Sequence, residues 1–289
     1  MKIACVFGGS GFLGSHVADK LSDAGYKVRI FDLVPSPWIQ PDQDMIVGSI
    51  NDQVAVNKAI EGSDVVYNFA ALADLNKGLN NPLDTVRINV LGNAYVMEGC
   101  RRFGVQRFVY ASTVYVYSRD GGFYRCSKQA SEHYVEEYQN VYGLDYTILR
   151  YGSLYGSRTD DSNGIYRVVK KALETGSIEY QGNPDSLREY IHVEDAALAS
   201  VEILKESYSN QSVILTGHEP MRVLDMLEML AEILGLSNAV KFTSGKQLGH
   251  YVRTPYAYQP KLGRKYIPSC HVDLGQGLMH LIDEIREKI

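Results

Sequence analysis

Short apolar runs alternate with amphipathic stretches along the first half of the chain. The run at 2–7, "KIACVF", is typical of a buried strand, and the helical period over 11–24 predicts a helix after it. The same patterns predict further strands at 27–31 and near 45–47, 64–69, 107–111 and 145–149, and helices near 52–60, 83–103 and 124–142. This alternation is typical of a parallel sheet covered by helices on both faces. We therefore expect an α/β fold with a doubly wound parallel-sheet (Rossmann) domain at 1–150.

The alternation weakens after about residue 150, where glycines separate shorter elements. Residues 151–186 and 208–289 are expected to form a smaller mixed α/β lobe that binds the substrate. The segment "REYIHVEDAALASVEILK" (188–205) again has the pattern of a strand followed by a helix, so 187–207 is expected to return to the main sheet. Because such sheets bind ligands outside the carboxyl ends of their strands, residues in the loops there are the candidates for chemistry.

Composition and charge exclude several classes of function. Of 289 residues, 45% are hydrophobic and 22% are charged, with a formal net charge of −5, as in an ordinary soluble globular protein. No basic block indicates nucleic-acid binding, no apolar stretch is long enough to span a membrane, and the N-terminus lacks a signal-peptide pattern. The four cysteines are widely spaced and the seven histidines form no ligand cluster, so we expect a cytoplasmic protein without a metal site.

Gly8, Gly11 and Gly14 form a GxxGxxG pattern in "CVFGGSGFLGSH", between the first strand and the first helix. Glycines there allow a tight turn and let a pyrophosphate approach the positive end of the helix. Asp32 ends the second strand about 20 residues on, where a carboxylate accepts hydrogen bonds from the adenosine ribose and repels a 2′-phosphate. Two aliphatic residues follow it, so no arginine receives that phosphate. The pattern favours NAD(H) over NADP(H), although a solvated loop carboxylate is the alternative for Asp32.

Tyr124 and Lys128 lie four residues apart in "GGFYRCSKQASEHY" (121–134), where a helical pattern begins. Positions i and i+4 share a helix face and lie about 6 Å apart along the axis. An ammonium beside a phenol favours the phenolate, which accepts a hydroxyl proton as hydride leaves the carbon. The segment "RFVYASTVYVYS" (107–118) predicts a strand with Thr113 at its tip, where a hydroxyl can hold the substrate oxygen. Two solvated side chains and an ordinary strand end are the alternative interpretation.

The chain resembles the extended short-chain dehydrogenase/reductases, of the NAD-dependent nucleotide-sugar epimerase/dehydratase family. The resemblance implies catalysis by Thr113, Tyr124 and Lys128 at C4 of a nucleoside-diphosphate sugar, through a 4-keto species. It implies a 4-epimerase or a 4-dehydrogenase, with a smaller lobe that binds the nucleotide sugar. The matching segments are "GGSGFLG", Asp32, "NFAALAD" (68–74), "INVLGN" (88–93), "ASTVYVYS", "YRCSK", "LRYGSLYG" (149–156) and "REYIHVEDAA" (188–197), in the family's order.

The resemblance also assigns binding residues and a partner. Two arginines are implied at the substrate diphosphate, because a planar guanidinium meets phosphate oxygens in pairs. The outer faces of the helices at 83–103 and 124–142 are implied to form the contact of a homodimer. The substrate-binding residues are Thr113, Ser153, Arg188 and Arg253. The cofactor-binding residues are Gly8, Gly11, Phe12, Leu13, Gly14, Asp32, Leu33, Ser49, Ile50, Phe69, Ala70, Ala71, Asn89, Tyr124, Lys128 and Tyr151.

The chain departs from the family pattern close to the catalytic residues. Val114 and Tyr115 stand where the 4,6-dehydratases have the Asp-Glu pair that performs the elimination, so we do not expect dehydration. The connection from Thr113 to Tyr124 is shorter than is usual in the family. Part of the substrate cover is therefore expected to be missing, which leaves the sugar pocket open or shaped by a partner subunit.

Three other functions fit parts of this pattern. A 4-ketoreductase of a nucleotide sugar uses the same residues in reverse, although Asp32 argues against an NADPH-driven reductase. A dehydrogenase of a non-nucleotide alcohol leaves Arg188 without a phosphate to bind. A non-catalytic NAD(H)-binding module has no need of Thr113, Tyr124 and Lys128 together. Substitution of Arg188 and of Tyr124 therefore separates these functions from one another.

Overall fold

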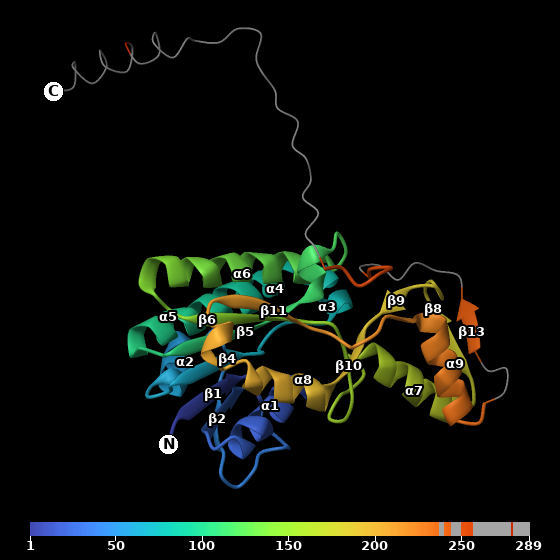
Figure 1. Cartoon of the computed structure of the whole chain (residues 1–289), viewed down its shortest axis with the longest axis horizontal. Coiled ribbons are helices and arrows are strands. Elements are labelled where there is room, and N and C mark those ends of the chain that lie inside the picture. Colours follow the sequence, from blue (N-terminus) through green and yellow to red (C-terminus); the bar gives the residue numbers. More distant parts are fainter. Residues whose placement is uncertain (237–239, 244–249, 257–278, 280–289) are drawn as a thin grey trace. The chain divides into compact units, whose positions relative to one another are not determined.

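Seven parallel strands form the central sheet, in the order β11-β6-β5-β4-β1-β2-β3 (Figure 1). The computed structural model describes residues 1–236, 240–243, 250–256 and 279. All of these except residue 279 belong to the unit Met1–Tyr258. The strands are β1 (Ile3–Phe7), β2 (Lys27–Asp32), β3 (Asp44–Val47), β4 (Val65–Asn68), β5 (Arg107–Thr113), β6 (Tyr146–Tyr151) and β11 (Gln211–Leu215).

Helices cover both faces of this sheet, and the alternation of side chains along β1 shows why. Ala4 and Val6 belong to the core cluster beneath α1 and α8, whereas Cys5 and Phe7 belong to the cluster beneath α2, α5 and α6. A strand that is buried on both faces is apolar at every position, as "IACVF" is. The helices are α1 (Phe12–Asp23) and α8 (Val193–Glu202) on one face, and α2 (Gln53–Ile60), α5 (Asn93–Phe103) and α6 (Gly122–Tyr142) on the other.

Two irregular helical segments lie between these elements. The first runs through α3 (Leu75–Asn80), α4 (Pro82–Thr85) and a π-helical segment, η1 (Val86–Gly92), directly into α5. The second is a 3₁₀ turn, η2 (Val114–Tyr117), which follows β5 and precedes α6. In the part of the chain that the structure describes, no helix combines the length and the apolar character needed to cross a membrane.

The smaller lobe contains short strand pairs and its own core. β10 pairs with β7 and β13 with β8 in parallel, and β12 pairs with β9 in antiparallel orientation. Residues from α7, β8 and α9, among them Ala172, Ile178 and Leu227, form a separate buried cluster. The elements are β7 (Ser153–Tyr155), α7 (Gly164–Thr175), β8 (Ile178–Gln181), β9 (Leu187–Arg188), β10 (Tyr190–His192), β12 (Met221–Arg222), α9 (Val223–Ile233) and β13 (Val240–Thr243). The short 3₁₀ turn η3 (Glu206–Tyr208) instead contacts strands of the main sheet.

The structure confirms the predicted fold class and corrects two boundaries. The strand part of 187–207 does not join the main sheet, because β9 and β10 pair with β12 and β7. Its helix, α8, does return, since Ala196 and Ala197 pack into the core beneath the sheet. The sequence pattern places residues 208–289 in the smaller lobe, but β11 lies within them and forms the edge of the main sheet beside β6. A short apolar run shows that a strand forms but not which sheet it joins.

Candidate active site

The tip of β5 and the start of α6 are brought together by a short turn. Thr113 ends β5, and its side-chain oxygen accepts a hydrogen bond from the Tyr115 amide at 3.3 Å, which starts the 3₁₀ turn. Gly121 then adopts a φ of 94°, and a Cβ there would lie 2.8 Å from the Tyr115 ring. Only glycine fits this backbone and this contact without strain. The turn therefore places Tyr124 in the first turn of α6, close to Thr113.

Thr113, Tyr124 and Lys128 lie together at the carboxyl edge of the sheet. Thr113 and Tyr124 line the same cavity, and the Thr113 side chain acts to lower the pKa of Tyr124. The Lys128 ammonium, 2% exposed, donates a hydrogen bond of 2.6 Å to the carbonyl oxygen of Ala111. Its Nζ lies 5.8 Å from the centroid of the Tyr124 ring and 4.7 Å from that of Tyr110. The structure thus brings the three predicted catalytic side chains into one group.

Burial dominates the electrostatics of this group. Burial raises the pKa of Tyr124 to about 12, although the Thr113 side chain acts in the opposite direction. Burial lowers the pKa of Lys128 to about 7, and the Glu132 carboxylate opposes that shift. Desolvation penalises the charged form of each group. The prediction that the ammonium and a bound nicotinamide cation together favour the phenolate concerns the enzyme with its cofactor, and it stays a prediction.

The glycine loop between β1 and α1 has the shape of a pyrophosphate cradle. Gly8 has a φ of 77°, and a Cβ there would lie 2.6 Å from the backbone nitrogen of Ala70. A Cβ on Gly14 would lie 2.2 Å from the carbonyl oxygen of Gly8. Helix α1 begins at Phe12, directly after Gly11. It has no side-chain cap and no acidic residue in its first turn. Its first N–H groups are therefore available to an anion, and the loop fits the diphosphate of a dinucleotide.

Asp32 connects the end of β2 to this loop. One carboxylate oxygen accepts a hydrogen bond from the Ser10 amide at 3.0 Å, and the other accepts one from the Leu33 amide at 2.7 Å. The Ser10 hydroxyl in turn donates to the carbonyl oxygen of Val34 at 2.8 Å. Each carboxylate oxygen has two lone pairs, so Asp32 can hold the loop and still accept hydrogen bonds from ribose hydroxyls.

Other residues predicted at the cofactor lie at different depths. Phe69, Ala70 and Ala71 follow β4 directly, and the Phe69–Ala70 backbone lies against Gly8. Leu33 is 67% exposed beside Asp32. Leu13 lies in the first turn of α1 and packs partly against the core. The structure places Phe69 and Ala70 beside the glycine loop, and the contact of this set with the cofactor stays a prediction.

A second set of predicted cofactor residues makes contacts with the backbone and side chains that surround the site. The side-chain oxygen of Asn89, in the π-helical segment, accepts a hydrogen bond from the Leu72 amide. Its side-chain nitrogen donates to the Leu72 carbonyl oxygen and to the Ser127 hydroxyl. The Tyr151 hydroxyl lies 2.6 Å from that of Ser200 in α8. Ile50 is buried in the core against Gly92, and the Ser49 hydroxyl accepts a hydrogen bond from the Asn51 amide. These side chains fix the surrounding backbone, which sequence position alone does not reveal.

A cavity of about 480 Å³ extends from Thr113 and Tyr124 into the smaller lobe, where Ser153 and Arg188 line it. Arg188 is 8% exposed, and its guanidinium lies over the Tyr251 ring at 4.4 Å from the centroid. Its hydrogen bonds to the described residues come from Nη1, which donates to the carbonyl oxygens of Leu187 and Val252. The other nitrogens of this guanidinium can therefore donate to phosphate oxygens.

Several residues that line this cavity were missed by sequence reasoning. His250 and Tyr251 are among them and lie far along the chain from the catalytic motifs. The Tyr115 hydroxyl lies 2.9 Å from Nδ1 of His250, and the Tyr115 and Tyr251 rings are 4.7 Å apart. These aromatic side chains occupy the space beside the short turn after Thr113. No periodicity or spacing in the sequence indicates such a contact.

Arg253, predicted to bind the substrate diphosphate, lies outside the residues that line the cavity. It pairs with Leu187 through an isolated β-bridge, and its side chain is exposed. Tyr251 and Thr254 are the buried residues of this segment. The direction of each side chain here depends on how the segment turns, and the sequence does not show that.

Residues 4–215 match the family described as the NAD dependent epimerase/dehydratase family. This chain belongs to that family. A relative named as a putative UDP-glucose 4-epimerase, from Methanocaldococcus jannaschii, is 27% identical over 251 residues, which are 80% of this chain and 82% of the relative. UDP-glucose 4-epimerase from Thermotoga maritima, solved with UDP-glucose, has a TM-score of 0.81 at 24% identity, covering 100% of this chain and 99% of that one. UDP-glucose 4-epimerase from Thermus thermophilus, solved with NAD, has a TM-score of 0.79 at 23% identity, covering 100% of both chains.

Membership in the NAD dependent epimerase/dehydratase family confirms three predictions from the sequence. The suspected family is correct, the protein is an enzyme, and NAD is its cofactor. The fold agrees as well, since solved epimerases superimpose on the whole chain. The glycine loop and Asp32 are the features of this member that fit NAD.

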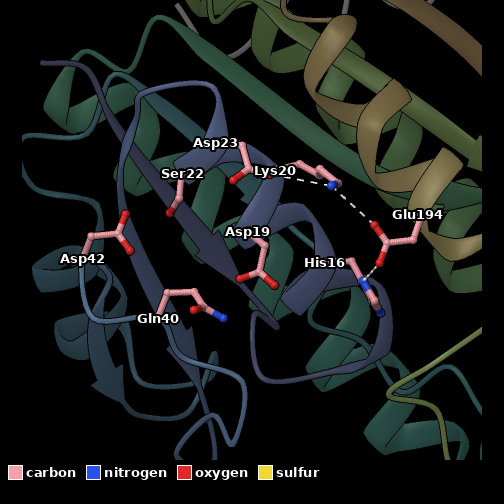
Figure 2. Close-up of a pocket in the computed structure, with 8 residues that line it drawn as sticks. All are labelled: His16, Asp19, Lys20, Ser22, Asp23, Gln40, Asp42 and Glu194. Atoms are coloured by element: carbon pink, nitrogen blue, oxygen red, sulfur yellow. Dashed lines mark ion pairs between the residues drawn. The ribbon is translucent and has the colours of Figure 1, made fainter.

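A second hollow, of about 410 Å³, lies beside α1 and shares no residue with the cavity at Tyr124 (Figure 2). His16 and Lys20 pair with carboxylates that line the hollow. The Glu194 carboxylate lies 3.0 Å from Nδ1 of His16 and 3.5 Å from Nζ of Lys20, as the dashed lines in Figure 2 mark. Nε2 of His16 faces the carbonyl oxygen of Ser157 at 3.2 Å. These contacts attach α8 and the loop after β7 to α1, which is a structural role.

Proposed function

We propose that this enzyme oxidises C4 of a nucleoside-diphosphate sugar with NAD and forms a 4-keto species, as a 4-epimerase or a 4-dehydrogenase. One observation carries the proposal: a single cavity joins the hydroxyls of Thr113 and Tyr124 to the guanidinium of Arg188. A proton-transfer group at one end and a phosphate-binding group at the other match a sugar joined to a diphosphate. The relatives named as UDP-sugar 4-epimerases support this substrate class.

The residues of the cavity account for the proton transfer. The Thr113 hydroxyl orients the C4 hydroxyl against Tyr124, and the Tyr124 phenolate takes its proton. When bound, NAD⁺ supplies the hydride acceptor and a positive charge that favours the phenolate. Lys128 would hold the nicotinamide ribose, and burial lowers the pKa of this lysine to about 7. In the reverse step the Tyr124 phenol returns a proton to the 4-keto oxygen.

The same cavity does not support dehydration. Elimination of water needs an acid and a base beside the sugar, at the two positions that follow Thr113 in the dehydratases. Here Val114 is buried, and the Tyr115 hydroxyl is bound to His250. We therefore propose that the 4-keto sugar is either released or reduced again, and is not dehydrated.

Replacing Arg188 with alanine tests the substrate class. We expect KM for the nucleotide sugar to rise by about 10²-fold, because charged hydrogen bonds to the diphosphate are lost. Arg222→Ala on β12, the strand that pairs with β9, is the matched control, because Arg222 is exposed and outside the cavity. Steady-state kinetics give KM, and calorimetric NAD binding verifies that each variant is folded. Unchanged KM in Arg188→Ala would instead favour a non-nucleotide alcohol.

A panel of nucleoside-diphosphate sugars will identify the substrate. The purified enzyme with NAD⁺ is incubated with each sugar, NADH is followed by absorbance, and the sugars are separated by chromatography. Accumulation of NADH with a 4-keto sugar identifies a 4-dehydrogenase, and a C4 epimer without net NADH identifies a 4-epimerase. Silence across the panel contradicts the proposal.

We also propose that the protein is a cytoplasmic homodimer. Support for the dimer comes from exposed apolar side chains on the two helical segments that the sequence indicated. Leu83 and Val86 lie on α4 and η1, and Phe123, Tyr134 and Val141 lie on α6. Apolar groups that share one surface are typical of an interface between copies. We expect Tyr134→Glu with Val141→Glu to convert a dimer into a monomer, which light scattering measures; a wild-type monomer contradicts the proposal.

The cytoplasmic location has separate support, because the exposed free thiol of Cys126 is typical of a reducing compartment.

A further inference from the structure

Helix α6 carries a third polar residue on the face that holds Tyr124 and Lys128. Glu132 follows Lys128 by one turn and is 6% exposed. Its carboxylate accepts hydrogen bonds from the Ser112 hydroxyl at 2.5 Å and from Arg150 on β6, through Nε at 3.0 Å and Nη2 at 2.7 Å. The Glu132 and Arg150 side chains are 8% and 14% exposed, so both charges of this ion pair are buried.

These contacts hold the backbone of the catalytic strand. Lys128 binds the carbonyl oxygen of Ala111, and Glu132 binds the side chain of the next residue, Ser112. Two side chains one turn apart on α6 therefore form hydrogen bonds with adjacent residues of β5, immediately before Thr113. Arg150 extends the connection to the turn after Thr113, because its Nη1 donates to the Tyr117 hydroxyl and its guanidinium lies 4.8 Å from the centroid of that ring.

Stability alone does not explain a buried ion pair at this place. Taking two charges out of water is costly, and replacing such pairs with apolar residues is often neutral or stabilising. Glu132 lies one turn after Lys128 on the same face of α6, and its carboxylate opposes the burial that lowers the pKa of this lysine. Among the described residues, the rings of Tyr110 on β5 and Tyr124 on α6 also face Lys128. Ser112 and Arg150 bind Glu132, and the charge of Glu132 also acts on the hydroxyls of Tyr110 and Tyr146.

We propose that Glu132 and Arg150 form a positioning pair for the catalytic site, in which Glu132 keeps Lys128 protonated and Arg150 limits how strongly it does so. The pair acts through Lys128 and the tip of β5 and does not touch the substrate. The proposal extends the role given to Lys128 above, and it is testable without any sugar. If the proposal is correct, substituting one member of the pair leaves a single charge near Lys128. The sign of that charge then decides whether the lysine loses its proton at a lower or a higher pH.

The test is the dissociation constant of NAD⁺ as a function of pH, measured by titration calorimetry. Because Lys128 lies at the cofactor site, the midpoint of this pH dependence reports its proton loss in the free enzyme. In Glu132→Gln a lone positive charge remains, and we expect the midpoint to fall by about one pH unit. In Arg150→Gln a lone negative charge remains, and we expect it to rise. Glu136→Gln, an exposed carboxylate on the same helix, is the control without a shift.

The two substitutions break the same ion pair, and this separates the proposal from a purely structural role. A structural role predicts that both variants change binding in the same direction or leave the midpoint unchanged, and either result overturns the proposal. Glu132→Asp retains the charge, so its midpoint is expected to remain near that of the wild type even if turnover falls. If one single variant does not fold, the other still shows whether the midpoint rises or falls. The midpoint of the double variant Glu132→Gln/Arg150→Gln is expected to lie between those of Glu132→Gln and the wild type. Failure of the sugar panel leaves this result unaffected.

Discussion

Tyr124→Phe is expected to lower the turnover number by about 10³-fold, because it removes the proton-transfer group and nothing else. The ring remains beside Lys128, so NAD binding measured by calorimetry should stay close to that of the wild type. Tyr134→Phe, which removes an exposed hydroxyl from the same helix, is the control and should retain full turnover. Single-turnover formation of NADH with the nucleotide sugar measures the effect. Undiminished turnover in Tyr124→Phe would show that another group is the base, and would revive the non-catalytic interpretation of this tyrosine.

Gly14→Ala is expected to abolish NAD binding and to destabilise the protein. The added Cβ would lie 2.2 Å from the carbonyl oxygen of Gly8, a backbone atom that cannot move without opening the turn. Overpacking of this kind costs about 3 kcal/mol or more of unfolding free energy. It also displaces the start of α1 from the pyrophosphate site.

Denaturant unfolding and calorimetric titration with NAD⁺ measure the two effects of Gly14→Ala. Gly78→Ala is the matched control, because a Cβ there meets only the Thr85 side chain, at 3.8 Å, within helix α3. Alanine favours a helix over glycine, so this control should be as stable as the wild type or more stable. Wild-type NAD affinity in Gly14→Ala would mean that the glycine loop is not the pyrophosphate site.

The parts of the site that the sequence predicted are those made by neighbours in the chain. Gly8 and Gly11 lie between β1 and α1, Gly14 lies in the first turn of α1, and Tyr124 and Lys128 share one helix face. Such patterns need only local geometry to be interpreted. The parallel arrangement of the main sheet followed in the same way, because each crossover helix is contiguous with its two strands.

The parts that the sequence did not predict are contacts between distant segments. His250 reaches Tyr115 across 135 positions, and Arg150 on strand β6 reaches Glu132 on helix α6. Each of these residues is common on protein surfaces, so its type carries no signal until the fold places it. The burial of Tyr124 is hidden from the sequence for a related reason. Spacing shows that an ammonium is near, but only the packed structure shows how much water both groups have lost.

The position of β11 has a consequence for how this protein is made. The edge strand β11 follows α8 in the chain. During synthesis, β6 therefore has no neighbour on that side until the first part of the smaller lobe and α8 have been made. A fragment that stops at residue 150 leaves unpaired the N–H and C=O groups of β6 that face β11, and a bare edge of this kind recruits other chains into aggregates. A shortened form of the protein made for cofactor studies therefore has to extend through Leu215, and a chain leaving the ribosome keeps this edge open until that residue has emerged.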